Sequence, residues 1–359
     1  MPFILDVGTA VPDHTVPQDR AKEFAGRIFR TASFETDRLL PVFQNTQIRQ
    51  RHFCVEEEWF DEDLSFSEKN LVYVRFGVEL AERAVRDVLL RTGVPPEEIG
   101  HLFFVSSTGI ATPSIDAHLF NRIGLSPSVL RTPIWGLGCA GGVAGIVRAA
   151  DWLRAYPEKT ALVVALELCG LTFIRGDLSK SNFVATSLFA DGCGAVLMAG
   201  DGRRSTSARR ISIDMAAAVT WTDTLDIMGW EVVEKGLKVV FSRSIPAVVT
   251  ASARPTILKF LHERGLAPSD IAHFLSHPGG NRVIEAYKEA LALDENCLES
   301  MREVLRDYGN MSSATVCFVL KHFLDSGRFR AGDRVLSTAL GPGFSSEIFL
   351  GTCENGVRP

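Results

Sequence analysis

The sequence is poor in the features that mark membrane, secreted and nucleic-acid-binding proteins. No apolar run approaches the roughly 18 residues that a membrane span needs, and the longest, at 161–166, predicts a buried strand. Lys plus Arg (38) do not exceed Asp plus Glu (43), and this net charge of −5 argues against a surface built for nucleic acid. The first residues show no basic segment followed by a cleavage site, so we expect no secretion.

Cysteine is present without the spacing that a structural role requires. The seven cysteines are odd in number and contain no CxxC pair, which excludes a disulfide framework and a zinc site of that type. Among the eight histidines, only His273 and His277 lie four apart, with no third ligand close in sequence. We therefore predict no metal, a cytoplasmic location, and thiols that are mostly inert core residues.

The composition and the hydrophobic pattern predict a layered α/β protein. Hydrophobic residues make up 46% and charged residues 23% of 359 residues, enough for a full core and for about two domain-sized units. Strands are predicted where apolar runs are short, and helices where apolar residues recur every three or four positions. The strands are 101–107, 161–166, 195–198, 271–276 and 335–339, and the helices are 72–91, 143–153, 248–265 and 282–291. Their alternation is typical of an α/β fold.

A weak internal repeat suggests that the chain has two similar halves. Gly138-Cys139-Ala-Gly-Gly opens one apolar helix, and Gly309-Asn310-Met-Ser-Ser opens another about half a chain length later. The polar stretch 201–210 is the best candidate boundary, so we expect halves at 1–205 and 206–359. A duplicated fold would place one polar residue at each equivalent helix N-terminus.

Three residues could carry nucleophilic chemistry. Cys139 stands between glycines at a predicted helix N-terminus, a position that favours the thiolate, although a buried cysteine beside packing glycines is the alternative. His277 ends a predicted strand before Pro-Gly-Gly, where it could pair with a thiolate or simply lie at the surface. Asn310 could cap a helix or donate its amide to a carbonyl.

Cysteine, histidine and asparagine in this order are compatible with two chemistries. A papain-like protease uses them, but the flanking CGSCW-type sequence, a secretory propeptide and disulfides are missing. In decarboxylative condensation, the cysteine is acylated while histidine and asparagine together bind a thioester oxygen. The second chemistry fits the flanking residues better.

Five motifs in order resemble the chalcone synthase-like type III polyketide synthases, and the resemblance covers nearly the whole chain. PIWGLGCAGG and Met228-Gly-Trp are similar to the bacterial branch, which includes alkylpyrone synthases. Ketoacyl synthase III shares the three candidate residues but fits the last two motifs less well. The motifs are Gly138-Cys-Ala-Gly-Gly142, Leu188-Phe-Ala-Asp-Gly192, His277-Pro-Gly-Gly280, Gly309-Asn-Met-Ser-Ser313 and Gly341-Pro-Gly-Phe344.

The resemblance implies a thiolase-type αβαβα fold of two similar halves, a homodimer, and coenzyme A thioesters as substrates without a metal or redox cofactor. Cys139 would hold the growing acyl chain, and His277 would stabilise its thiolate as an ion pair. His277 and Asn310 would bind the malonyl thioester oxygen while carbon dioxide leaves, because donors placed for the enolate charge supply a large part of such catalysis.

Other positions are assigned by the same resemblance. Phe189 matches a gatekeeper between the coenzyme A tunnel and the acyl cavity. Cys169, Thr172 and Ser312 match residues that line the cavity, together with the Gly341-Pro342-Gly343 loop, which could equally be an ordinary turn. Ser107, Glu167 and Ser312 match positions that activate a water for aldol closure in stilbene-forming relatives.

The sequence also departs from the plant enzymes. Val239 stands where a second gatekeeper phenylalanine is expected, and Thr112 replaces a methionine that crosses the dimer interface. The candidates for coenzyme A phosphates, Arg38, Arg49 and Arg51, could also be ordinary surface charges. With Val239 in place of a phenylalanine, the passage into the acyl cavity would be wider. We therefore predict medium- or long-chain fatty acyl-CoA starters, a few malonyl-CoA extensions, and alkylpyrones with some alkylresorcinol as products. The alternatives are a ketoacyl synthase that condenses once and a non-catalytic protein that binds acyl-CoA.

Overall fold

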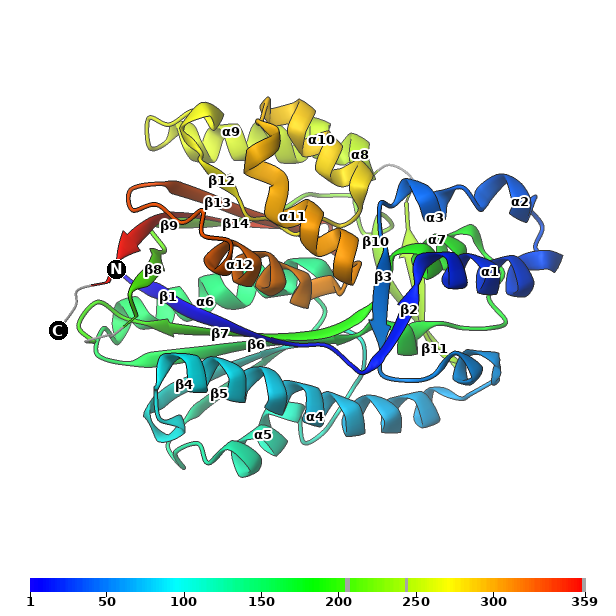
Figure 1. Cartoon of the computed structure of the whole chain (residues 1–359), viewed down its shortest axis with the longest axis horizontal. Coiled ribbons are helices and arrows are strands. Elements are labelled where there is room, and N and C mark those ends of the chain that lie inside the picture. The colour runs from blue at the N-terminus through cyan, green and yellow to red at the C-terminus, as the bar shows by residue number, and fades with distance from the viewer. Residues whose placement is uncertain (204–206, 243–244, 357–359) are drawn as a thin grey trace.

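Five layers, alternating helix and sheet, form the body of the protein (Figure 1). The structure is a computed structural model that describes residues 1–203, 207–242 and 245–356. Two helices fill the middle layer between the sheets, two cover one outer face and three cover the other. In that order the helices are α6 (Gly141–Ala155) and α12 (Thr315–Asp325), α4 (Phe66–Thr92) and α5 (Ile115–Ile123), and α9 (Arg254–His262), α10 (Asn281–Leu291) and α11 (Glu295–Tyr308). This confirms the predicted αβαβα fold.

Ten strands make the two sheets in the described residues: nine form one continuous hydrogen-bonded path, and β9 pairs with β14 off this path. They are β1 (Phe3–Ala10), β4 (Ile99–Val105), β5 (Leu130–Ile134), β6 (Thr160–Leu168), β7 (Asp191–Ala199), β8 (Arg209–Ser212), β9 (Met215–Thr220), β12 (His273–Phe274), β13 (Arg334–Gly341) and β14 (Ser345–Asn355). The order is β12-β13-β14-β8-β1-β7-β6-β4-β5, with β9 beside β14. Strand β8 pairs with both β14 and β1 and so joins the two sheets. The predicted boundary at 205/206 lies outside the described residues.

The central strands are apolar at almost every position because helices cover both of their faces. All nine residues of β6 and all nine of β7 are buried, and the two strands pair antiparallel from Thr160–Ala199 to Leu168–Asp191. This explains why the sequence shows continuous apolar runs there and no alternation. Helix α4 lies against this sheet and has clear ends, with a Ser65–Glu68 capping box and Gly93 at φ +66.

Most predicted elements are present, with two differences in the C-terminal half. The predicted strand at 271–276 is assigned only at His273–Phe274, although Leu275 and His277 still donate backbone N–H groups to β13 carbonyls. The predicted helix at 248–265 starts as a π-helical turn (Val249–Ala253) before α9. In both places the backbone hydrogen bonding is irregular, but the order of strand and helix along the chain is as predicted.

Shorter elements gather at one end of the layers, on the right of Figure 1, and cover the region where the middle helices begin. They include one antiparallel strand pair, one hairpin and several helices. These are β2 (His14–Pro17) with β3 (Gln50–Phe53), β10 (Met228–Val233) with β11 (Gly236–Phe241), α1 (Gln18–Ile28), α2 (Thr36–Leu39), α3 (Val42–Asn45), α7 (Lys180–Leu188) and α8 (Ile245–Val248).

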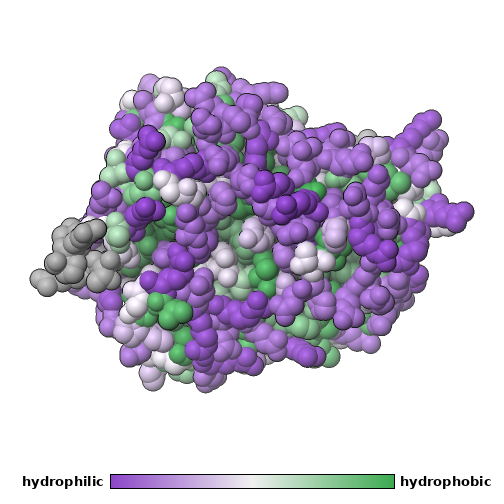
Figure 2. Space-filling model, in the orientation of Figure 1, coloured by the Kyte–Doolittle hydropathy of each residue, from purple (hydrophilic) through white to green (hydrophobic). Residues whose placement is uncertain are grey.

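The surface is mainly polar on the face that Figure 2 shows, where apolar residues form only scattered patches. Across residues 1–203, 207–242 and 245–356, no helix is long and apolar enough to cross a bilayer.

Candidate active site

Cys139 lies in the 3₁₀ turn η4 (Gly138–Ala140), which leads directly into α6. Gly138 has φ +47, a conformation that L side chains rarely adopt, and a Cβ there would lie only 2.7 Å from Pro342 Cδ. The Cys139 side chain is buried, and its Sγ lies 3.5 Å from Ser312 Oγ. The glycine turn and the loop after β13 therefore hold the thiol at the start of a long helix.

His277 follows β12, and its backbone N–H donates to Thr338 O at 3.0 Å. Its imidazole is 5% exposed, and neither Nδ1 nor Nε2 has a hydrogen-bond partner among the described residues. Buried polar groups in native proteins are nearly always hydrogen-bonded, and those that are not are often found at functional sites. The ring is therefore available to a ligand.

The Asn310 amide is fixed in one orientation by two hydrogen bonds. Its Nδ2 donates to Gly279 O at 2.8 Å, and its Oδ1 accepts from the Ser312 N–H at 2.8 Å. The backbone is held as well, because the Asn310 N–H donates to Leu188 O and the Ala190 N–H donates to Asn310 O. An amide nitrogen has two hydrogens, so one Asn310 N–H stays free for a substrate oxygen within the described part of the chain.

A single pocket of about 550 Å³ brings Cys139, His277 and Asn310 together. Three exposed cations, Arg38, Lys180 and Arg282, also line this pocket and lie on its solvent side. We name it the catalytic pocket. Apolar residues dominate the rest of its wall, so the reacting groups stand at the end of an apolar cleft that has a basic rim.

Burial favours the neutral form of each reactive group. It raises the pKa of the Cys139 thiol to about 12 and lowers the pKa of the His277 imidazole to about 3. Cys139 and His277 line the same pocket, and the predicted thiolate–imidazolium ion pair stays a prediction. Opposite charges would offset the cost of burial for both groups, and transfer of the thiol proton to the ring as an acyl thioester arrives would form them.

Comparison with known proteins agrees with this geometry. Sequence models for the N-terminal and C-terminal domains of chalcone and stilbene synthases match residues 1–202 and 213–352. The chain belongs to this family. It is a type III polyketide synthase, an acyltransferase that condenses malonyl-CoA. The non-catalytic alternative is thereby wrong.

Three relatives illustrate the likeness. A putative chalcone synthase of Bacillus subtilis is 44% identical, covering 99% of this chain and all of that protein. A crystal structure of 1,3,6,8-tetrahydroxynaphthalene synthase from Streptomyces coelicolor superimposes with a TM-score of 0.93 at 29% identity, covering 99% of this chain and 100% of that one. An α-pyrone synthesis polyketide synthase-like protein of Mycobacterium tuberculosis is 27% identical over 96% of this chain and 89% of that protein.

Glu167 is fully buried near the end of β6. Its carboxylate accepts hydrogen bonds from the Ser107 N–H at 3.0 Å, Thr108 Oγ1 at 2.8 Å and Ser313 Oγ at 2.5 Å. Burial raises its pKa to about 7, although these donors oppose the rise. Of the predicted set of Ser107, Glu167 and Ser312, Ser107 therefore contacts Glu167 through its backbone N–H, and the role of the three residues in activating water stays a prediction.

The two predicted hydroxyls point elsewhere. Ser107 Oγ accepts from the Gly138 N–H at 3.1 Å, and Ser312 Oγ faces Cys139. Thr108 and Ser313, each next in sequence to a predicted serine, bind the carboxylate in their place. Ser313 ends the Gly309–Ser313 motif and Thr108 directly follows a predicted strand, but only the fold decides which of two adjacent hydroxyls faces Glu167.

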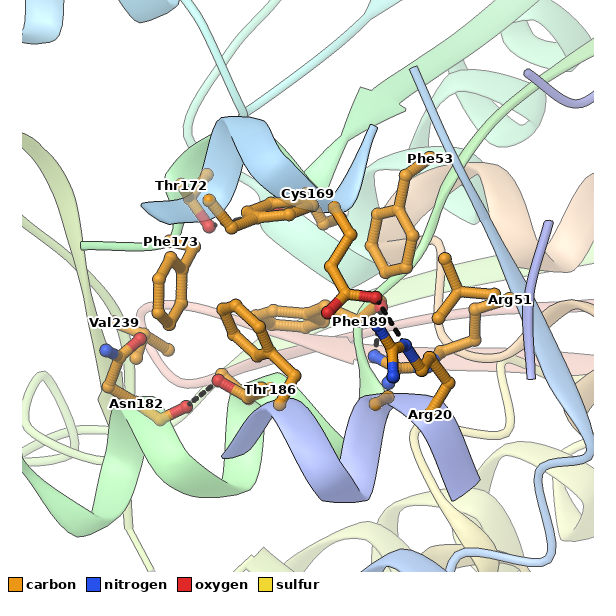
Figure 3. Close-up of a pocket in the computed structure, with 17 residues that line it drawn as sticks. Arg20, Arg51, Phe53, Cys169, Thr172, Phe173, Asn182, Thr186, Phe189 and Val239 are labelled. Carbon is orange, nitrogen blue, oxygen red and sulfur yellow. Dashed lines mark hydrogen bonds and ion pairs between the residues drawn. The ribbon is translucent and has the colours of Figure 1, made fainter. Parts of the chain in front are cut away.

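A second cavity, of about 60 Å³, contains four of the predicted substrate-binding residues (Figure 3). Cys169, Thr172, Phe189 and Val239 line it and do not line the catalytic pocket. The Phe189 ring lies 5.5 Å, centre to centre, from Phe241, which does line the catalytic pocket. These two rings form a partition between the spaces, and we name the second one the side cavity.

The three predicted coenzyme A arginines have different environments. Arg38 lines the catalytic pocket, whereas Arg49 pairs with Asp307 at 3.1 Å outside it. Arg51 is only 2% exposed, and its Nη1 donates to Phe189 O at 2.8 Å. The expectation of a phosphate contact does not fit Arg51, because its guanidinium is already used inside the protein.

Sequence reasoning missed Lys180 and Arg282, since isolated cations carry no motif. The Gly341-Pro342-Gly343 loop packs against the turn that carries the nucleophile, because a Cβ on Gly138 would meet Pro342 and a Cβ on Gly341 would lie 2.3 Å from Leu137 O. None of the three loop residues lines the catalytic pocket, so their substrate contact stays a prediction. Among the described residues, no three His, Cys, Asp or Glu side chains gather as a metal site would require. His273 instead pairs with Asp333 at 2.9 Å.

Proposed function

We propose that the synthase transfers a medium- or long-chain fatty acyl group from coenzyme A to Cys139 and extends it with a few malonyl units. Release of the product then occurs mainly as an alkylpyrone. The observation that carries the catalytic part is the set of unpartnered polar groups, both ring nitrogens of His277 and one Asn310 N–H, that share a buried pocket with the thiol.

Each residue has a defined task in this reaction. In loading, the Cys139 proton moves to His277, sulfur attacks the acyl carbonyl, and coenzyme A leaves with a proton. In extension, the bond between the malonyl α-carbon and its carboxylate breaks, carbon dioxide leaves, and the electron pair becomes an enolate whose oxygen is bound by His277 and Asn310. The enolate carbon then attacks the acyl carbonyl, and the bond to Cys139 sulfur breaks.

The exposed Arg38, Lys180 and Arg282 are proposed to bind the phosphates of coenzyme A, because cations at the rim can neutralise them while the thioester enters the apolar pocket. A structurally similar protein, CsyB, has been crystallised with coenzyme A. All seven cysteines carry free thiols, which supports a reducing, cytoplasmic setting.

Three observations support the proposed product class: the side cavity, one relative and the buried Glu167. An apolar space beside Val239 favours aliphatic starters by about 0.8 kcal/mol for each buried methylene. The mycobacterial relative is named for α-pyrone synthesis. Glu167 provides a buried acid that could activate water for some aldol closure to alkylresorcinol. A single condensation, as in ketoacyl synthase III, is the alternative, and product masses separate the two.

The catalytic assignment is tested with three alanine variants. Cys139→Ala should abolish condensation yet still release carbon dioxide from malonyl-CoA, because decarboxylation uses only His277 and Asn310. His277→Ala and Asn310→Ala should lower decarboxylation by about 10² to 10³ each. Mass spectrometry after acyl-CoA treatment should place the adduct on the Cys139 peptide. An adduct on Cys169 or Cys193, or normal turnover in either donor variant, would contradict the assignment.

A further inference from the structure

We propose that the buried Glu167 carboxyl receives its proton from Lys69 on α4, through Thr108 and a small polar cavity, and not through the catalytic pocket. In one respect this rests on the proposed function, because Glu167 would use the proton when it activates water for aldol closure. Lys69 and Thr108 are thereby positioning residues, which act through Glu167 and do not touch the substrate.

The titratable groups around Glu167 are poor partners for proton exchange. Those that feel its charge are the phenol of Tyr73 and the thiols of Cys139, Cys169 and Cys193. Burial raises the pKa of each of these four groups, so they keep their protons near neutral pH. A proton that reaches or leaves Glu167 at that pH therefore needs another route.

Thr108 connects Glu167 to a cavity of about 10 Å³, which we name the relay cavity. Thr108 Oγ1 donates to Glu167 Oε2 at 2.8 Å, and Thr108 also lines this cavity together with Lys69 and Thr172. Neither Glu167 nor Thr108 lines the catalytic pocket. A space of this size is just large enough for one water molecule, and the three polar side chains supply the two to four partners that a buried water needs.

Lys69 is a buried amine with unused hydrogen-bonding capacity. The residue is only 6% exposed, and its Nζ donates to Phe173 O at 2.6 Å. An ammonium group has three N–H donors, so two remain available to a water in the relay cavity within the described part of the chain. A buried lysine without a carboxylate bonded to it is uncommon, and such incompletely partnered groups are often functional.

The surroundings of Lys69 allow its charge to change near neutral pH. Burial lowers the pKa of its ammonium to about 8, Lys235 lowers it further, and Asp63 opposes the change. Asp63 and Lys235 pair with each other at 2.9 Å at the surface, and a Cβ on Gly236, in the turn between β10 and β11, would lie 3.9 Å from Lys69 Nζ. Because the Glu167 pKa is about 7, a proton can pass between the two buried groups at small cost.

The hydrogen bonds point in the direction of delivery. Thr108 Oγ1 accepts from the Leu168 N–H at 2.9 Å and gives its own proton to the Glu167 bond, so one lone pair is left to accept from a water that Lys69 holds. One proton leaves Lys69 Nζ and one arrives at Glu167, while the water and Thr108 each take up one and pass one on. The neutral Lys69 amine then regains a proton from solvent.

The route is tested by following the Glu167 carboxyl itself in the whole enzyme. Below its pKa the protonated carboxyl gives an infrared C=O band, assigned by its loss in Glu167→Gln, and this band shifts when deuterium replaces the proton. After rapid mixing with heavy water, the shift should be about 10²-fold slower in Lys69→Met than in wild type, because a positioned proton donor is worth at least that much. Equal rates would show that the proton arrives by another route and would overturn the inference.

Lys238→Met is the matched control, because it removes the same charge from a nearby strand. Lys238 pairs with Glu231 at 3.1 Å at the surface and does not line the relay cavity. This variant should exchange at the wild-type rate, and equal slowing in both methionine variants would assign the effect to net charge and contradict the relay. In Lys69→Ala, added methylammonium should restore exchange, whereas tetramethylammonium, which has no proton to give, should not. Equal recovery with both cations would exclude proton transfer from this position.

Product analysis separates this inference from the proposed function. Where wild type forms alkylresorcinol, Lys69→Met should lower its share and leave alkylpyrone formation and malonyl-CoA decarboxylation unchanged, because the catalytic pocket is untouched. Unchanged decarboxylation also shows that the variant is folded. If wild type forms no alkylresorcinol, the aldol part of the proposed function fails, whereas the infrared exchange rates still decide whether Lys69 supplies the Glu167 proton.

Discussion

At the scale of single residues, the buried Glu167 carboxyl makes stability depend on pH. Its folded pKa of about 7 lies above the ordinary value of 4.5, so the folded state binds its proton more tightly than the unfolded state does. Stability is therefore full below about pH 4.5 and falls as pH rises toward 7, by up to about 3 kcal/mol for this group. Glu167→Gln can accept two of the hydrogen bonds and donate to Ser313 Oγ in place of the third without a charge, so its urea midpoint should fall less than that of wild type between pH 5 and 8. Parallel pH profiles would show that the carboxyl is not the titrating group.

Val239 is the residue at which starter choice can be tested most directly. It is 7% exposed, pairs with Trp230 across the hairpin and lines the side cavity. Val239→Phe should reduce the use of long starters relative to short ones, because the larger ring occupies the passage. Its neighbour Val240 points to the other face of the strand, so Val240→Phe is the control. If Val239→Phe uses long chains as well as wild type, the widened-gate argument is wrong.

At the scale of elements, the sequence predicts the buried strands and amphipathic helices well, because continuous apolar runs and a 3.6-residue period are local signals. It also places Cys139, His277 and Asn310 at element ends. It cannot show that Arg51 turns inward or that the hydroxyls of Thr108 and Ser313, and not those of their neighbours, bind Glu167, since these depend on how distant segments pack. Burial likewise raises the pKa of the Cys139 thiol, an effect that no motif records.

The start of α6 is the element whose packing constrains the site most tightly. A Cβ on Gly142 would lie 2.2 Å from Ser313 O, a backbone atom that has little freedom to move. Gly142→Ala should therefore destabilise the protein by about 1–3 kcal/mol and lower turnover, although alanine is the better helix former. Gly26→Ala on α1, whose Cβ would meet only Leu40 methyls at 3.9 Å, should be neutral or stabilising. Equal unfolding midpoints for the two variants would contradict the packing argument.

At the scale of the whole molecule, strand β5 is the last strand of its sheet, so one of its edges has no neighbouring strand among the described residues. Large apolar side chains surround this open edge. Leu130 is 50% exposed, Trp135 52% and Ile110 46%, and Thr112, at the position of the interface methionine in plant relatives, lines the same hollow as Ile110 and Trp135. An open edge beside exposed apolar groups favours association, and a two-fold pairing would bury the same surface on both chains.

We therefore predict a homodimer joined at this edge. Leu130→Asp combined with Trp135→Glu should place charges opposite their own copies, and the mass from light scattering should fall from two chains to one. The controls are Leu71→Asp and Leu90→Glu, which change leucines that are 72% and 85% exposed on α4 and should leave the mass unchanged. Because the catalytic trio comes from one chain, the monomer should retain malonyl-CoA decarboxylation. A dimer that survives the Leu130 and Trp135 changes would place the interface on another face.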